Sequence, residues 1–506
     1  MAEAFVQGFL QVFTWPAFGL LLLGMVIGFA VGILPGLGGA VTVALLLPFT
    51  FTMTPLQAFA FLLSMLSVTA TAGDITSVLF GVPGEATTAA TVIDGYPMTK
   101  KGEAGRALGA ALFSSLIGAV IGAFALAAMV PIVRPLVLAF GSPEFFMLTL
   151  LGITFVAALS GEEVLKGLIA AGLGFMLSMI GLDQQTGIQR ATFGRLELWD
   201  GIGLVAITIG LFAIPETIEL ALSGTSIARE GASKVGGVMV GVRDTITHIW
   251  LTVRCSLLGT AVGIVPGLGG AVAQWIAYAH AVQTSPNKER FGHGAVEGVL
   301  GPGAANNSKE GGNLILTVVF GVPPSVTMAI LLGAFLIQGI TPGPDMLDPN
   351  KHLTLTFSMV WFIVITNIIT VAISILFINQ LVKITYIRGT LVIPFVLFLV
   401  FFGAYAEKNT LFDVGLVLVF GTLGWIMVQT NWPRPPLVLG LVLGRLAERY
   451  LFLSYNRYGW DWLGRPMVIF FDVAIVAVLL YSIHGSLKSG KEKGAGPPLP
   501  GNATEV

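Results

Sequence analysis

The stretch GILPGLGGAV at residues 32–41 returns as GIVPGLGGAV at residues 263–272. Both copies interrupt a long apolar segment with residues that disfavour a helix interior, because proline removes a backbone hydrogen bond and glycine weakens helix preference. Each copy should therefore end one helix and begin another. The slightly longer windows 30–41 and 261–272 agree at eleven of twelve positions, which indicates a duplicated chain.

The composition places this chain in the membrane. Of its 506 residues, 55% are hydrophobic and 10% are charged, and the mean hydropathy is +0.88. Such a chain cannot present a water-compatible surface. Many of its apolar runs are near the ~20 residues that a helix needs to cross the hydrocarbon core. We therefore expect an all-α polytopic protein in the lipid bilayer, with about 12 transmembrane helices.

Charge and cysteine content argue against several classes of function. A net charge of −1 without a basic, aromatic-rich patch argues against nucleic acid as a partner. Cys255 is the single cysteine, so the chain has no disulfide framework and too few thiols for a zinc or iron–sulfur site. The histidines show no metal-ligand spacing. The sequence predicts no cofactor, and no metal beyond Na⁺ as a coupling ion.

Further repeats divide the chain into two related halves. VLFGVP at residues 78–83 is matched by VVFGVP at 318–323, and IDGYPM at 93–98 by IQGITP at 337–342. Such repeats are typical of secondary transporters, in which two halves enclose a site near the midplane. The predicted units are residues 1–222 (first half, motifs 30–41 and 78–98), 223–248 (cytoplasmic linker), 249–485 (second half, motifs 261–272 and 304–344, then C-terminal helices) and 486–506 (disordered tail).

The basic residues indicate how the halves are oriented. No lysine or arginine precedes Lys100, whereas the segments 99–106 and 223–248 each carry three or more. Basic residues in short loops favour the cytoplasm, so both segments are predicted to be cytoplasmic. An even number of candidate crossings separates them, which is consistent. If the N-terminus is outside, the two repeats are inverted relative to each other.

The interrupted segments have a predicted chemical purpose. Backbone groups freed at membrane depth are tolerated only where they are buried in protein or line a wet cavity. Freed carbonyl groups can coordinate Na⁺, and helix N-termini offer N–H groups to an anion. The residues predicted to contact substrate in this way are Pro35, Gly36, Gly38, Gly267 and Gly269. The alternative is that these glycines only allow close helix packing.

The two FGVP motifs predict re-entrant hairpins at residues 75–93 and 314–337. Their tips, at Pro83, Gly84 and Pro323, are predicted to contact substrate, and each arm is expected to be too short to span the membrane. The alternative for each segment is an ordinary span with a kink.

Polar residues near the hairpins are the candidate ligands, because such groups are costly at membrane depth. Amide and carboxylate oxygens coordinate cations, and amide N–H groups donate to carboxylates. Asn306 and Asn307 are predicted to contact substrate, and Asp74, Thr76 and Asn306 to bind the cation. The other charged residues beside the hairpins are Glu85, Asp94, Lys309 and Glu310. Lys309 pairs either with an anionic substrate or with Glu310.

At these motifs the chain resembles the large membrane subunit of the tripartite tricarboxylate transporters. The matching text is GILPGLGG, GLFAIPE, GIVPGLGG and AANN, with the long runs at residues 72–109 and 320–344. The resemblance implies a symporter of the bacterial inner membrane that imports carboxylates such as citrate with Na⁺ or H⁺. It also implies two partners, a small membrane subunit and a periplasmic solute-binding protein of the same system.

The chain departs from this family at one place beside the predicted site. Where the family usually continues the asparagine pair with small residues, this chain has Ser308, Lys309 and Glu310. The two added charges suggest a carboxylate other than citrate or altered ion coupling.

We therefore expect a secondary active transporter and not an enzyme, with two classes left open. A cation channel would also use interrupted helices and carbonyl oxygens. An intramembrane hydrolase would use Asp74 and Asp94 as a carboxylate pair.

Overall fold

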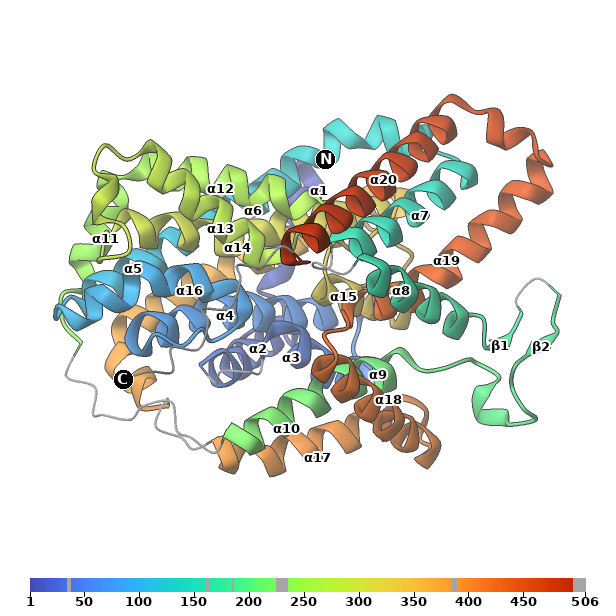
Figure 1. Ribbon diagram of the computed structural model, residues 1–506, viewed down its shortest axis with the longest axis horizontal. Coiled ribbons are helices and arrows are strands. Elements are labelled where there is room, and N and C mark those ends of the chain that lie inside the picture. Colours follow the sequence, from blue (N-terminus) through green and yellow to red (C-terminus); the bar gives the residue numbers. More distant parts are fainter. Residues whose placement is uncertain (34–37, 160–163, 184–185, 224–234, 385–388, 495–506) are drawn as a thin grey trace, which may run out of the picture.

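The computed structural model is almost entirely helical (Figure 1). It describes residues 1–33, 38–159, 164–183, 186–223, 235–384 and 389–494. Within them, the strands β1 (Gly181–Leu182) and β2 (Gln189–Arg190) form a short antiparallel hairpin, which the all-α prediction did not include.

Helices of the first half are α1 (Ala2–Val12), α2 (Ala17–Gly32), α3 (Gly39–Leu46), α4 (Pro55–Phe80), α5 (Ala89–Lys100), α6 (Ala104–Ala139), α7 (Ser142–Leu159), α8 (Val164–Ser178), α9 (Leu204–Thr208) and α10 (Ile214–Ser223). Those of the second half are α11 (Val238–Thr247), α12 (Ile249–Ile264), α13 (Gly269–Thr284), α14 (Glu297–Phe320), α15 (Val326–Ile337), α16 (Leu353–Ile384), α17 (Gly389–Lys408), α18 (Leu411–Gln429), α19 (Pro435–Tyr458) and α20 (Pro466–Gly494).

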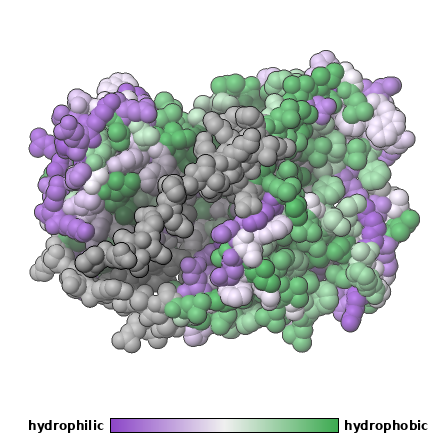
Figure 2. Space-filling view, viewed as in Figure 1, coloured by the Kyte–Doolittle hydropathy of each residue, from purple (hydrophilic) through white to green (hydrophobic). Residues whose placement is uncertain are grey.

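The helices have the lengths and composition of a membrane protein. Among the described residues, five are long and apolar enough to cross a membrane, and the pair α1 and α2, bent by 66°, is a sixth candidate. Six shorter apolar helices accompany them, so the count of about 12 crossings stays a prediction. On the face seen in Figure 2, hydrophobic residues cover much of the right half, and hydrophilic residues gather at the left and right ends and in a patch near the lower centre.

Both interrupted segments break a helix, as the sequence predicts. In the first half α2 ends at Gly32 and α3 begins at Gly39, and in the second half α12 ends at Ile264 and α13 begins at Gly269. Gly267 has φ 85°, a left-handed conformation that favours glycine. Pro35 and Gly36 lie outside the described residues.

The sequence repeat is also a repeat of structure. Helix α4 is followed by the C-cap Gly81 (φ 68°, ψ 18°) and α14 by the C-cap Gly321 (φ 69°, ψ 18°). The following helices, α5 and α15, have 12 residues each. The residues before these second arms match as well, with φ −143° and ψ 166° at Glu85 and φ −142° and ψ 165° at Ser325. The two hairpins therefore share the same backbone conformation at these positions.

The hairpins differ from the prediction in their first arms. Helix α4 is continuous for 26 residues and α14 for 24, so the expectation that every arm is too short to span is wrong for α4. The polar residues of α4 do not interrupt it because their hydroxyl groups bond to its own carbonyl groups; Ser77 Oγ, for example, donates to Gly73 O at 2.9 Å. The second arms alone are short.

The two halves pack against each other through several pairs of helices. The first helix of each half packs on the long helix of the other half: α1 on α16, and α11 on α6. Helix α14 also packs along α6, and α15 packs on α3. The hairpins therefore sit between the halves, with the buried surface shared by both.

Helices occupy parts of the two segments that are predicted as a linker and a tail. The proposed linker 223–248 contains α11, whose apolar positions Val238 and Val242 are buried beside α6. The proposed tail from residue 486 begins inside α20, which continues to Gly494. Residues 495–506 lie outside the described part of the chain.

Candidate functional site

One face of α14 carries the polar residues of the candidate site. Asn306, Lys309, Glu310 and Asn313 are spaced so that they share a face of the helix. Every residue of α14 from Gly298 to Val319 is buried. Buried polar groups need partners, so the contacts of these side chains indicate which of them hold helices together and which could bind a ligand.

Asn306 and Asp74 meet between α14 and α4, as the sequence predicts. Asn306 Nδ2 donates to Asp74 Oδ2 at 3.1 Å and to Ala70 O at 2.9 Å. Both side chains are fully buried. Among the described residues, Asp74 Oδ1 and Asn306 Oδ1 have no partner with hydrogen-bond geometry, and the hydroxyl of Thr91 is the additional donor beside Asp74. Buried acceptor oxygens with so few donors are costly alone, so this place is suited to a cation or a proton.

Asn307 faces a different set of helices from Asn306. Its Nδ2 lies 2.6 Å from Thr71 Oγ1, 2.9 Å from Ser115 Oγ and 2.7 Å from Asn367 Oδ1. These oxygens belong to α4, α6 and α16. The amide N–H groups of Asn307 therefore join four helices, while its Oδ1 is buried and has no hydrogen-bond partner in the described part of the chain.

Lys309 and Glu310 form a buried ion pair. Lys309 Nζ lies 2.6 Å from Glu310 Oε1, and the two side chains are 6% and 8% exposed. Asn313 Nδ2 donates to the other carboxylate oxygen at 3.1 Å. Lys309 also interacts electrostatically with Glu85 and Asp74. Neighbouring residues of a helix do not face each other, so the surroundings direct these two side chains together.

The tip of the first hairpin contacts the interrupted segment of its own half. Glu85 Oε2 accepts from the amide of Gly39 at 3.1 Å, and Glu85 Oε1 accepts from Thr87 Oγ1 at 2.5 Å. The carboxylate therefore lies at the N-terminus of α3, where the helix dipole favours an anion. Gly38 precedes that helix and lies beside the same carboxylate.

Gly84 and Thr76 lie close together inside this hairpin. A Cβ added to Gly84 would stand 2.9 Å from Thr76 Oγ1 and 2.9 Å from Gly32 O, so the backbone approach requires glycine. Thr76 Oγ1 donates to Gly73 O at 3.1 Å, which leaves its lone pairs available.

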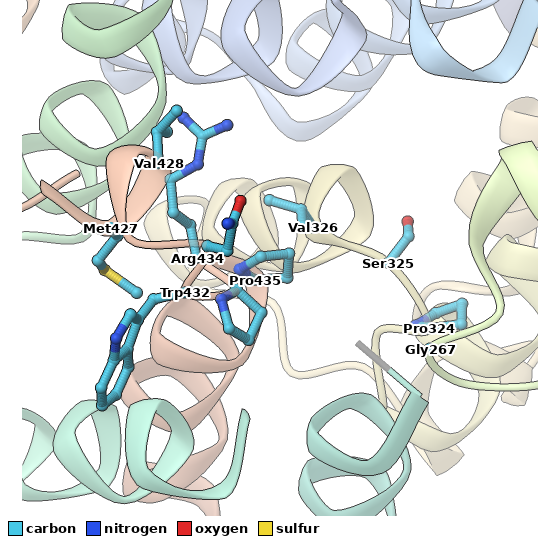
Figure 3. A pocket seen from close by; sticks show the side chains of 11 residues that line it. Gly267, Pro324, Ser325, Val326, Met427, Val428, Trp432, Arg434 and Pro435 are labelled. Atoms are coloured by element: carbon cyan, nitrogen blue, oxygen red, sulfur yellow. The ribbon is translucent and has the colours of Figure 1, made fainter. Parts of the chain in front are cut away.

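The second hairpin borders a cavity of about 450 Å³ (Figure 3). The amide of Gly267 donates to Pro324 O at 2.9 Å, which ties the second interrupted segment to this tip next to Pro323. Across the cavity, Arg434 donates to Leu211 O at 3.0 Å and to Glu216 Oε1 at 3.1 Å. The sequence analysis missed Arg434; its signal is the proline-flanked NWPRPP between α18 and α19.

Asp94 is a structural anchor and does not form a carboxylate pair with Asp74. Its Oδ1 accepts from the amides of Gly294 at 2.8 Å and Ala295 at 2.9 Å, and its Oδ2 accepts from Tyr278 at 3.0 Å. Asp74 bonds instead to Asn306. The described residues contain no group of three or more acidic, histidine or cysteine side chains that could hold a metal ion.

Replacing Asp94 by alanine should lower the free energy of unfolding by about 3 kcal/mol or more, because three donors, one of them buried and two half-buried, lose a charged acceptor. Thermal unfolding of the detergent-solubilised protein measures this change. Asp345→Ala is the control, since it removes an exposed partner of Lys351 and should cost less than about 1 kcal/mol. Equal thermal shifts in the two variants would contradict the anchoring role.

Comparison with known proteins identifies the family. The family model of the tripartite tricarboxylate transporter TctA family matches residues 18–439. The uncharacterized 52.8 kDa protein in TAR-I ttuC' 3'region of Agrobacterium vitis is 35% identical over 428 residues, which is 85% of each chain. A second protein of that organism, in TAR-II ttuC' 3'region, is 35% identical over 193 residues, 38% of this chain and 79% of its own. No solved structure matches the chain. The chain belongs to the tripartite tricarboxylate transporter TctA family.

Proposed function

We propose that this chain is the large permease subunit of a secondary transporter that imports small organic carboxylates, of the citrate or tricarboxylate kind, by symport with Na⁺ or H⁺. It would work in the bacterial inner membrane with a small membrane subunit and a periplasmic solute-binding protein. The family membership supports the class of function. The substrate, the ion and the partners are the parts that experiment must test.

The observation that carries the proposal is the Asp74 and Asn306 contact between the halves. Asp74 belongs to α4 of the first half and Asn306 to α14 of the second, and each has one buried oxygen without a partner of hydrogen-bond geometry among the described residues. Carboxylate and amide oxygens are the ligands that hard cations prefer. A cation bound here would contact both halves, so its binding would depend on their arrangement.

Alternating access is the proposed mechanism. The duplicated hairpins and interrupted helices are of the kind that secondary transporters place near the midplane, and inverted repeats would let the two halves exchange inward and outward arrangements. The distribution of basic loops supports this inverted topology. The cavity beside Pro323 and Arg434 is a candidate part of the substrate path, because arginine and helix N-termini favour carboxylates.

The test is uptake into vesicles that carry the protein with its candidate partners. Radiolabelled citrate and a panel of other carboxylates are supplied with and without an imposed Na⁺ gradient, and then with an imposed pH gradient. Accumulation of one carboxylate driven by one gradient is the expected result. An ion current without accumulation of any carboxylate, in an assembled complex, would replace the transporter with the channel.

A further inference from the structure

The equivalent helix N-termini of the two halves of the chain have different contacts. Gly39 and Gly270 occupy matching positions in the repeat, as do Glu85 and Ser325 in the hairpins. In the first half the carboxylate of Glu85 accepts from the Gly39 amide. In the second half Ser325 caps its own helix α15, where its Oγ accepts from the amide of Met328 at 3.3 Å. Among the described residues, Ser325 therefore does not supply Gly270 with the carboxylate that Glu85 supplies to Gly39.

The stem of a buried lysine lies beside Gly270. The stem of Lys309 packs directly on Gly270: a Cβ added to Gly270 would overlap Lys309 Cε and would stand 2.7 Å from Lys309 Cδ and 2.6 Å from Thr87 Cγ2. Gly270 belongs to the first turn of α13, whose N–H groups have no acceptor within the helix. The stem of Lys309, the first turn of α13 and the tip of the other half's hairpin thus meet at one place.

The ammonium of Lys309 has N–H donors left for a second partner. It has three N–H donors, and its hydrogen-bond partner among the described residues is Glu310 Oε1. Glu310 is itself held by Asn313 at 3.1 Å, so its position does not depend on Lys309 alone. A carboxylate that reached Lys309 would compete with Glu310 for the same charge.

We propose that a carboxylate of the substrate binds between Lys309 and the first turn of α13 at Gly270, and that this binding releases Glu310 to take the coupling cation. The proposal rests on the proposed function and adds its coupling device. Substrate alone would leave Glu310 buried and unpaired, and cation alone would compete with Lys309. Each event is costly in a buried site, so the two ligands bind together.

The pair also explains how the added charges of this chain can serve transport. Before binding, Lys309 and Glu310 neutralise each other. After binding, Lys309 neutralises the substrate carboxylate and Glu310 neutralises the cation. The total charge in the site is the same in both cases when one cation accompanies one carboxylate group, which limits the electrostatic cost of burying an anion in the membrane.

The decisive experiment compares Glu310→Gln and Lys309→Met in the purified complex. The probe is the radiolabelled carboxylate that the wild type accumulates in the uptake panel, with citrate tried first, and its affinity is measured with and without the coupling cation. In the wild type, the cation should raise that affinity by a factor of about 5 to 150. In Glu310→Gln this cation-dependent increase in affinity should disappear, with a factor of about 1. Glutamine has no negative charge to pair with Lys309 or with the cation, so the carboxylate can bind Lys309 without the cation.

Lys309→Met should weaken carboxylate binding by about 30-fold or more in the presence of the cation. The matched control is Lys351→Met with Asp345→Asn, which removes an exposed pair of similar length, 2.7 Å, and should leave affinity and cation dependence unchanged. Wild-type cation dependence in Glu310→Gln, or wild-type affinity in Lys309→Met, would overturn the proposal.

A third variant keeps the test decisive if a single variant fails to fold. The exchange of Lys309→Glu together with Glu310→Lys retains a neutral pair but moves the ammonium away from Gly270, so carboxylate binding should be lost. Wild-type binding by this variant would overturn the inference. A wild type that accumulates no carboxylate would instead overturn the proposed function, so the two failures are distinct.

Discussion

Replacing Gly122 by leucine is expected to prevent the protein from folding in the membrane. Gly118 and Gly122 of α6 lie four residues apart and face α14, in the small-residue spacing that lets membrane helices approach closely. A Cβ at Gly122 would stand 2.9 Å from the Cα of Ser308, and one at Gly311 would stand 2.7 Å from the Cα of Gly122. The opposing atoms are backbone atoms, which cannot move aside as a flexible side chain can.

The effect of Gly122→Leu should be large because the crossing of α6 and α14 positions the residues of the candidate site. Helix α14 carries Asn306 and the Lys309–Glu310 pair, and α6 supports it along its length. Overpacking in a core usually costs about 1–3 kcal/mol, and a leucine between two backbones exceeds what local repacking can absorb. We expect no monodisperse peak in size-exclusion chromatography of the solubilised protein and no transport.

Gly172→Leu is the matched control for Gly122→Leu. Gly172 also lies inside a helix of the first half, α8, but a Cβ there would meet nothing within 4 Å. This variant should accumulate, elute and transport as the wild type does. Normal accumulation of Gly122→Leu would show that α6 and α14 do not cross as closely as the structure describes.

The duplication could be predicted from sequence because its proline and glycine residues act on the backbone around them. Single prolines and glycines are tolerated inside α6 and α14, but the PGLGG text combines a proline with three glycines, and its repetition located both breaks. The FGVP text located both hairpins, whose first arms end just before Gly81 and Gly321. The helix α11 was missed because the segment 223–248 was interpreted as a loop from its basic residues, whereas Val238 and Val242 of this helix are buried beside α6.

The candidate site could be predicted in part. The cost of polar groups at membrane depth pointed to Asp74 and Asn306, and the structure brings these two together. The same reasoning treated Asn306 and Asn307 alike, yet neighbours on a helix point in different directions, and Asn307 joins α4, α6 and α16 instead. The approach of Glu85 to Gly39 depends on how the hairpin folds back, which no local pattern encodes.

Replacing Asn306 by alanine is expected to reduce uptake by about 30-fold or more while the protein still folds. The change removes one unpaired cation ligand, Oδ1, and also the donor that holds Asp74 in place. A hydrogen bond to a charged group contributes about 1.5–3 kcal/mol, and every 1.4 kcal/mol is tenfold in affinity. If the cation binds here, most of that loss should appear as a higher cation concentration for half-maximal uptake.

Asn350→Ala is the control for Asn306→Ala, because Asn350 is exposed outside the helices and should tolerate the change without an effect on uptake. Asn306→Asp gives an independent reading of the same site. It places a second carboxylate beside Asp74, so like-charge repulsion should favour a bound proton or cation in the pair and make uptake more sensitive to pH than in the wild type. Unchanged uptake and unchanged cation dependence in Asn306→Ala, at normal expression, would remove Asn306 from the transport site and leave Asp74 as a buried structural carboxylate.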